Sequence, residues 1–373
     1  MKKGFLKYHY WAYAIVLIYV LVAICAPILS NQRALICKSS QGWFFPAFSD
    51  NVIDTTQYVV SNTCIYPMIR FSPNQIDHDI SVASSPLTKN GKHLLGTDKL
   101  GRDVAAGMVY GARTSLQIGF IAIFFSFMIG VPLGIVSAYY RDQGSQFNLL
   151  QFGWMFLVGI MMIFYLAYFP DYGDFHFGAV VMIILASIII MKVGNKIFST
   201  FKGCKKYNFP LDLLLIKIIE VRKSLPVIFV LLALTALFTS PSIWNIILII
   251  ILLSWTDFAR FARAETLAVK EESYILSAKV LGLNDLRISM RHIFPNILPT
   301  LVVIACFGVS SAILLESSLS FLGIGLPVEQ VTWGRMIADG RDMSAWWLVV
   351  FPGVALCILV LSLNIISERW QGT

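Results

Sequence analysis

The chain alternates between long apolar segments and shorter polar ones. Eight of the apolar segments are about as long as the roughly 20 residues that an α-helix needs to cross a bilayer. They lie at residues 11–29, 115–140, 149–169, 177–198, 213–238, 243–261, 297–315 and 346–366. The pattern predicts an all-α polytopic membrane protein of about eight transmembrane helices, with one long polar segment after the first of them.

Composition supports a membrane protein and argues against a nucleic-acid partner. Hydrophobic residues make up 57% of the 373 residues and charged residues 13%, and the mean hydropathy is +0.73. Soluble domains carry far more charge. The formal net charge of +8 would suit nucleic acid, but the basic residues lie in short segments beside apolar spans, where the positive-inside rule accounts for them.

The distribution of basic residues predicts which loops face the cytoplasm. Lys2, Lys3 and Lys7 precede the first span, and eight Lys or Arg residues lie between Lys192 and Lys223. The turn at residues 170–178 carries two acidic residues and no Lys or Arg. Because basic loops stay inside, we expect both termini in the cytoplasm and residues 31–113 outside.

Residues 260–299 form the longest charged, helix-compatible stretch between two apolar spans. We expect a helix at about 264–281, Gly282 as the C′ glycine, and Asn284 or Asp285 as the N-cap of a second helix that ends before Pro295. The first arm places two small residues before the turn, where another protein could approach the backbone. The second arm places two arginines four positions apart on one face. These are Ser277 and Ala278, and Arg287 and Arg291.

This helix, turn and helix resembles the EAA loop by which permeases of bacterial ABC importers contact their ATPase subunits. S-A-K-V-L-G and R-H-I-F-P-N match the motif of the peptide and nickel branch, except that Leu276 stands where the family has glutamate. Glu271 or Glu272, a turn earlier, could supply that charge instead. The alternative is an ordinary amphipathic loop. The resemblance implies ATPase coupling by Glu271, Glu272, Leu276, Ser277, Ala278, Lys279, Gly282, Asn284, Arg287, His292 and Pro295.

A second resemblance lies just before the span at 115–140. The sequences G-T-D-K-L-G-R-D and Y-G-A-R-T-S-L are similar to a signature of one permease subunit of dipeptide, oligopeptide and nickel importers. We expect a turn and an interfacial helix with a structural or docking role, against the alternative of a solvated turn with paired charges. The motif residues are Gly96, Thr97, Asp98, Gly101, Arg102, Asp103, Tyr110, Gly111 and Arg113.

A third resemblance follows the span at 297–315, in E-S-S-L-S-F-L-G-I-G and W-G-R-M-I-A-D-G-R. Glu316 lies where this span leaves the bilayer, and an ionisable group there is a candidate for a pathway or gate. The alternative is a carboxylate that reaches the interface or pairs with Arg335 or Arg341. Pro226, which the family also shows, should kink the span at 213–238 because proline removes a backbone donor.

The resemblance implies a six-helix permease core with an extra hairpin at residues 141–208, which we expect on the lipid-facing periphery. Because two added spans cross the membrane and return, the later loops stay on the side of the membrane that they have in the six-helix family. The predicted divisions are 1–30, the cytoplasmic tail and first helix; 31–113, the extracytoplasmic insert and interfacial helix; 114–140, a core helix; 141–208, the hairpin with a basic cytoplasmic loop; and 209–373, the core permease region with the coupling loop at 260–296.

Cysteine positions predict one disulfide. The six cysteines show no metal-ligand spacing, so we expect no metal site. Cys37 and Cys64 both lie in the polar segment predicted to be outside, in a compartment that permits disulfides. We expect them to pair and close the insert, against the alternative of two separate buried thiols.

No P-loop of the form G-x-x-x-x-G-K-[ST] occurs in the sequence, so any ATP hydrolysis falls to other chains. The resemblance therefore implies a non-catalytic permease with no cofactor of its own, in a bacterial inner membrane. It implies a second permease subunit, two ATPase subunits that bind ATP, and an extracytoplasmic solute-binding protein. The cargo would be di- or oligopeptides, or a related small solute such as nickel. The alternatives are a secondary transporter and an integral-membrane enzyme.

Overall fold

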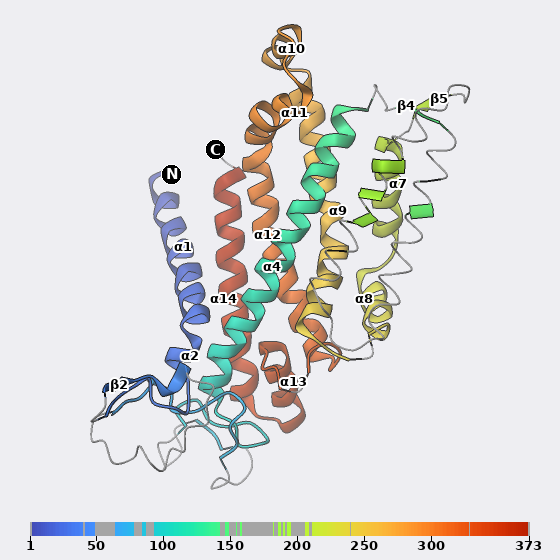
Figure 1. Ribbon diagram of the computed structural model, residues 1–373. Coiled ribbons are helices and arrows are strands. Elements are labelled where there is room, and N and C mark those ends of the chain that lie inside the picture. Colours follow the sequence, from blue (N-terminus) through green and yellow to red (C-terminus); the bar gives the residue numbers. More distant parts are fainter. Residues whose placement is uncertain are drawn as a thin grey trace.

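A computed structural model shows a bundle of long helices that run side by side between two differently built ends (Figure 1). The structure describes residues 2–39, 42–48, 64–77, 84–86, 93–141, 146–148, 206–208, 211–238, 240–327 and 329–371, with single residues between 154 and 194. Both ends of the chain lie at the same end of the bundle as α10 and α11. The strands β1 to β3 and helix α13 lie at the other end.

The described helices follow the apolar pattern of the chain closely. Four of them, or continuous helical runs, are long and apolar enough to cross a membrane: 104–139, 243–270, 285–321 and 346–370. Their elements are α4 (Val104–Tyr139), α9 (Ile243–Lys270), α11 (Asp285–Ile288) with a π-helical turn (Ser289–Ile293) and α12 (Phe294–Phe321), and α14 (Trp346–Gln371).

Shorter helices account for the remaining described spans and for both ends of the bundle. Helix α1 covers Lys2–Ile24, and the short α2 covers Ala26–Leu29. Helices α7 (Leu211–Ser224) and α8 (Val227–Ala236) lie in the predicted span at 213–238. Helix α10 (Ser273–Val280) projects at one end and α13 (Trp333–Met343) closes the other. Most of the predicted hairpin lies outside the described residues, so the count of eight spans stays a prediction.

The interfacial helix expected before Ser115 is wrong as a separate element. Helix α4 begins at Val104, where the Asp103 side chain accepts a hydrogen bond from the Ala106 amide, and it continues unbroken to Tyr139. Small residues let this first part of α4 pack closely. A Cβ on Gly111 would lie 2.5 Å from Cδ1 of Trp333 in α13. The polar start of α4 is therefore enclosed by protein and can remain collinear with the span.

Pro226 breaks its span where a kink was expected. Helix α7 ends at Ser224 and α8 begins at Val227, with Pro226 as the N-cap in an extended conformation at φ −60° and ψ 129°. The proline ring also disfavours the helical conformation for the residue before it. The restrictions on Pro226 and on Leu225 before it therefore end α7 and start α8.

The helices that flank the predicted coupling loop are longer than expected. Helix α9 reaches Lys270, so the single helix expected at 264–281 is instead divided at Glu271 and Glu272. The second arm does not end before Pro295 but continues through the π turn into α12. Pro295 stands at the first turn of α12, where the wider turn before it makes a missing amide donor tolerable.

The core of the bundle lies where α4 crosses α9 and α12. Ile118 on α4, Phe258 on α9 and Ile313 on α12 are all fully or almost fully buried. Gly130 and Gly134 of α4 approach the α9 backbone so closely that an added Cβ would clash with the carbonyl oxygens of Trp255 and Ala259. Small residues that permit such contact are a feature of helix packing in membranes.

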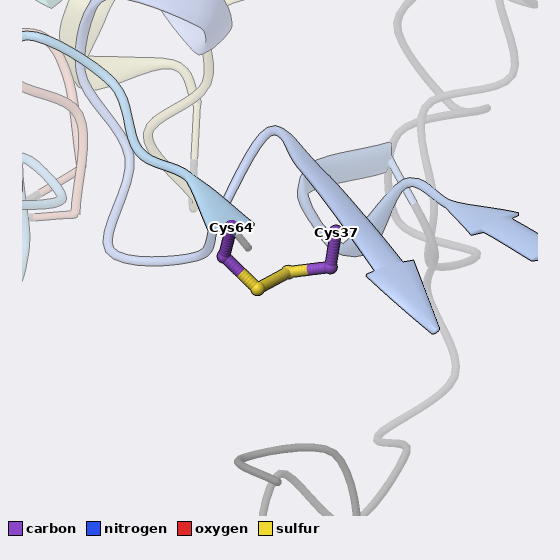
Figure 2. Close-up of a disulfide and its surroundings, with 2 residues drawn as sticks. All are labelled: Cys37 and Cys64. Atoms are coloured by element: carbon purple, nitrogen blue, oxygen red, sulfur yellow. A yellow bond between two sulfur atoms is a disulfide. The ribbon is translucent and has the colours of Figure 1, made fainter. Parts of the chain in front are cut away.

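A small antiparallel sheet at the end of the bundle opposite α10 carries the predicted disulfide. Strand β1 (Ile36–Ser39) pairs with β2 (Gly42–Phe44) on one edge and with β3 (Cys64–Ile65) on the other. Cys37 and Cys64 are directly opposite in the register, and their sulfur atoms are bonded (Figure 2). The bond joins two positions 27 residues apart.

The chain on either side of the predicted hairpin comes together in a second pair of strands. Strand β4 (Gln146–Asn148) pairs antiparallel with β5 (Lys206–Asn208), with Phe147 opposite Tyr207. The two ends of the extra segment are therefore adjacent in space. An insertion at one point of a core fold needs this proximity.

Candidate coupling site

Helix α10 ends in a glycine turn at the tip of the bundle. Gly282 has φ +75°, in the left-handed region that favours glycine. The Gly282 amide donates to the Lys279 carbonyl and the Leu283 amide donates to the Ala278 carbonyl. This pair of bonds is the Schellman motif, which satisfies the last carbonyls of a helix. The sequence prediction of a C′ glycine at this position agrees with the geometry.

The second arm starts at Asn284 rather than Asp285. The Asn284 side chain accepts a hydrogen bond from the Leu286 amide at 3.3 Å and caps α11. Asp285 is free of the capping role and faces the end of α4. The glycine turn and the cap together fix how the chain reverses between the two arms.

The inner face of the tip packs against the protein itself. Ile275 and Ile288 are fully buried, and Ala278 is 5% exposed. The expectation that Ala278 lets a partner approach the backbone is therefore wrong, because this methyl group faces the core. Ser277 is exposed, but its hydroxyl donates to the carbonyl of Ser273 within the helix.

The outer face of the tip is apolar and exposed. Val280 is 88% exposed and Leu281 79% exposed, which is unusual for large apolar side chains at the end of a loop. We call the exposed apolar residues of α10, α11 and the turn between them, with Met290 just beyond, the apolar tip. It consists of Leu276, Val280, Leu281, Leu286 and Met290. An exposed apolar group on a projecting element is typical of a protein interaction site.

The remaining predicted coupling residues surround the apolar tip. Glu271 and Glu272 are exposed at the break between α9 and α10. Arg287 and Arg291 are also exposed, and His292 is partly buried with its carbonyl accepting from Asn296. In the chain, the exposed acidic pair precedes the glycine turn and the exposed basic pair follows it.

The tip is held on the end of α4 by contacts that the sequence analysis missed. The Tyr139 hydroxyl donates to Oδ1 of Asp285 at 2.7 Å, and the Tyr140 hydroxyl donates to Oδ2 at 3.3 Å. The Lys279 ammonium lies 4.9 Å from the centre of the Tyr139 ring. The only sequence signal was the tyrosine pair itself, which gives no indication of a partner 146 positions away.

The segment at 96–113 forms a tight turn at the opposite end of the bundle. Gly96 and Gly101 have φ of +86° and +80°. One carboxylate oxygen of Asp98 accepts from the amides of Leu100 and Arg102, both at 2.8 Å, and the other accepts from the Arg102 guanidinium. The charges of the turn are paired, as the alternative expected, but Asp98 is only 7% exposed and so is not solvated. A structural or docking role of the motif stays a prediction.

This turn binds directly to α13, which carries the third sequence motif. The Lys99 ammonium forms an ion pair with Asp339, and the Arg102 guanidinium lies 3.9 Å from the same carboxylate. The Trp347 indole donates to the Thr97 carbonyl at 3.2 Å. The second and third motifs therefore meet in space, and we call their contact the motif clamp.

The other residues of the 96–113 motif have separate positions. The Tyr110 hydroxyl donates to the Ser30 carbonyl at 3.2 Å and so joins α4 to the end of α2. Gly111 makes room for the Trp333 ring, whose indole donates to the Met108 carbonyl. Arg113 is exposed on the surface of α4.

Glu316 lies in a buried cage of hydroxyl groups. Its carboxylate accepts from Ser115 on α4 at 3.1 Å and from Ser320 at 2.8 Å, with the Ser317 hydroxyl at 3.4 Å. The residue is fully buried. Among the described residues it has no ion pair with Arg335 or Arg341, and Arg341 pairs with Asp342 instead. The alternative of a snorkelling or arginine-paired carboxylate is therefore wrong, whereas a pathway role stays a prediction.

Two aspartates tie α7 to α9 near the same end as the apolar tip. Asp212 accepts two hydrogen bonds from the Arg263 guanidinium and one from Ser137, and the bonds from Arg263 lower the pKa of this carboxyl below its usual value. Asp257 lies 2.9 Å from Arg222 and from Lys223, and 3.9 Å from Arg260. These pairs connect the broken span to the helix that leads into the coupling loop.

The chain is similar in sequence to known transport proteins. Residues 197–372 match the family of binding-protein-dependent transport system inner membrane components. The dipeptide transport system permease protein of Alkalihalophilus pseudofirmus is 28% identical over 281 residues, covering 75% of this chain and 70% of that protein. The oligopeptide transport system permease protein of Haemophilus influenzae is 27% identical over 294 residues, covering 78% and 73%.

A solved structure of the MetNI methionine ABC transporter in an inward-facing conformation aligns with 71% of this chain and 95% of its own chain, at 16% identity and a TM-score of 0.44. Four described helical runs are long and apolar enough to cross a membrane, as in a multi-pass membrane protein. Residues 197–372 are similar to inner membrane components of binding-protein-dependent transport systems.

Proposed function

We propose that the chain forms half of the translocation pathway of an ATP-driven importer for di- or oligopeptides. The complete complex would contain a second permease subunit, two ATPase subunits and an extracytoplasmic solute-binding protein. The chain itself would catalyse no reaction and hold no cofactor, since ATP would bind to the ATPase subunits. Nickel or a related small solute is the alternative cargo.

The observation that carries this proposal is the apolar tip at the end of the bundle. A cluster of exposed leucine, valine and methionine side chains stands on a tightly bonded turn, and the turn is anchored to α4 through Asp285. Such a rigid apolar projection suits insertion into a cleft of another protein. The peptide names of the relatives support the choice of cargo.

The orientation of the proposed subunit follows from the same feature. If the ATPases bind the apolar tip, this end of the bundle is cytoplasmic. Both chain ends lie at that end in Figure 1, and the disulfide lies at the other. The disulfide would then face an oxidising compartment, which agrees with where disulfides persist.

Purification of the native complex in mild detergent tests the proposal. We expect ATPase subunits to copurify in stoichiometric amount, and proteoliposomes of the complex to accumulate labelled dipeptide only with ATP and the solute-binding protein. Uptake driven by an ion gradient without ATPase subunits would indicate a secondary transporter. A purified chain that converts a membrane substrate by itself would indicate an enzyme.

A further inference from the structure

A groove of about 650 Å³ opens between α9 and α12, with Ile123 of α4 among its lining residues. This volume is in the range that binds small organic molecules, about 300–1,000 Å³. Ser254 and Asp257 line it from α9, and Thr300 and Ser311 line it from α12. None of the residues that the sequence motifs singled out is among them.

The polar side chains in this groove indicate that it does not face lipid. Both helices are apolar enough to span a membrane, and a surface that contacts lipid gains nothing from hydroxyl and carboxyl groups. Polar groups within membrane spans face the protein interior or a water-filled cavity. Aromatic side chains, Phe261 and Phe307, share the groove with them, so both amide and apolar parts of a solute would find partners.

The two walls of the groove are the helices joined by the coupling loop. Helix α9 leads to the break before α10, and the run from α11 continues through the π turn into α12 without interruption. A displacement of the apolar tip is therefore applied directly to both walls. No other pair of described helices has this relation to the tip.

Charge within the groove indicates the class of solute. The Asp257 carboxylate is paired with Arg222 and Lys223 at 2.9 Å, and Arg260 lies 3.9 Å from it. Asp257 is the charged residue in the lining of the groove, and its ion pairs with these bases make its carboxylate a poor ligand for a bare divalent cation. Hydroxyl groups beside aromatic rings suit the neutral amide backbone of a peptide.

We infer that this groove is the surface of the chain that contacts the transported peptide, with the hydroxyls of Ser254, Thr300 and Ser311 as hydrogen-bonding partners of its amides. The inference rests on the proposed function of peptide import. It adds the location of the pathway and favours a peptide over a metal cation as the cargo.

Cysteine accessibility in the whole complex tests the inference. In a chain that keeps Cys37 and Cys64 but has its other four cysteines replaced by serine, Ser254→Cys and Thr300→Cys place thiols in the groove. Leu252→Cys and Leu298→Cys are matched controls on the same helices. Each control is two positions away from its partner, about 200° around the helix, and both leucines are exposed.

With a charged, water-soluble thiosulfonate reagent, we expect the two groove cysteines to react several-fold faster than the controls. Dipeptide, added with the solute-binding protein and ATP, should slow the reaction of the groove cysteines alone. Equal rates at groove and control positions in a complex that still imports dipeptide would overturn the inference and leave the proposed function intact. Protection by Ni²⁺ and not by dipeptide would overturn the solute class. A complex with ATPases but no dipeptide uptake would count against the proposed function itself.

Discussion

Lys99 and Asp339 form an ion pair, with Nζ 2.5 Å from Oδ1, although 240 positions separate them in the chain. The pair joins the turn before α4 to helix α13, and Arg102 contributes a second, longer contact to the same carboxylate. Two motifs that look independent in the sequence are therefore parts of one motif clamp.

Removal of the Asp339 carboxylate should loosen this clamp. We expect Asp339→Asn to lower the thermal stability of the purified complex, because Lys99 and Arg102 lose a partner that is 9% exposed at its side chain. A group left unpaired in a mostly buried site costs about 1–3 kcal/mol. Lys99→Met should cost a similar amount, because it leaves the Asp339 carboxylate, 9% exposed, with the 3.9 Å contact to Arg102 in place of a close ion pair. A double-mutant cycle measures the coupling, and strictly additive effects would contradict a direct interaction.

Gly282→Asp should abolish or weaken ATPase association and transport while the protein stays folded and inserted. No atom lies within 4 Å of an added Cβ at Gly282, so the change acts through backbone strain at φ +75° and through the new side chain at the docking face. The left-handed conformation costs a non-glycine residue roughly 1–2 kcal/mol. Copurification and uptake assays measure the outcome.

Two control variants separate the causes. Gly282→Asn tolerates the left-handed conformation better and should retain more ATPase than the aspartate variant. Gly353→Ala in α14 also meets no atom within 4 Å, without the positive φ, and should be neutral. Normal transport by the Gly282→Asp complex would remove this loop from the coupling mechanism.

Asp285 should matter for ATPase coupling because it accepts hydrogen bonds from both tyrosine hydroxyls at the end of α4. We expect Asp285→Asn and Tyr139→Phe each to reduce peptide-dependent ATP hydrolysis in proteoliposomes, with ATPase subunits still bound. The tip remains present in these variants but is held less firmly. The loss of one hydrogen bond typically costs about 1 kcal/mol of stability. Tyr140→Phe, which removes the longer 3.3 Å bond, is the milder comparison. Unchanged ATP hydrolysis in Tyr139→Phe would dismiss the anchoring role.

The acidic pair at the α9–α10 break should replace the glutamate that the motif lacks. Combined Glu271→Gln and Glu272→Gln should impair ATPase coupling, because these exposed carboxylates lie about one helical turn before Leu276, where the motif has its glutamate. Leu276→Ala should have little effect. The comparison is made by ATP hydrolysis at two salt concentrations, since an exposed ion pair weakens with salt. A larger loss in Leu276→Ala would show that apolar contact dominates.

Loss of the disulfide should destabilise the outer insert. Cys37→Ser with Cys64→Ser is expected to cost about 3–4 kcal/mol in the chain-entropy model for the closed loop, measured as the unfolding of the outer segment by limited proteolysis. Non-reducing electrophoresis with and without thiol reagent should show the bond in the natural protein. Two alkylatable thiols in an oxidised sample would refute the pairing.

The sequence by itself determined the local features of this protein. The apolar lengths of α4, α9, α12 and α14 follow from the need to satisfy every backbone group within the bilayer, so their approximate positions could be predicted. Gly282 could be predicted as a turn for a similarly local reason, because few other residues adopt a positive φ readily. The resemblance of three short motifs added the class of transporter.

Only the tertiary structure decided which of these elements meet. Asp339 pairs with the turn before α4, Asp285 accepts from Tyr139 at the end of α4, and Glu316 accepts from Ser115 within α4. Neither hydrophobic period nor span length specifies such long-range contacts. The exact ends of α4 and α12 were missed for the same reason. Whether a helix continues past its apolar stretch depends on the protein that encloses it, as Trp333 encloses the start of α4 at Gly111.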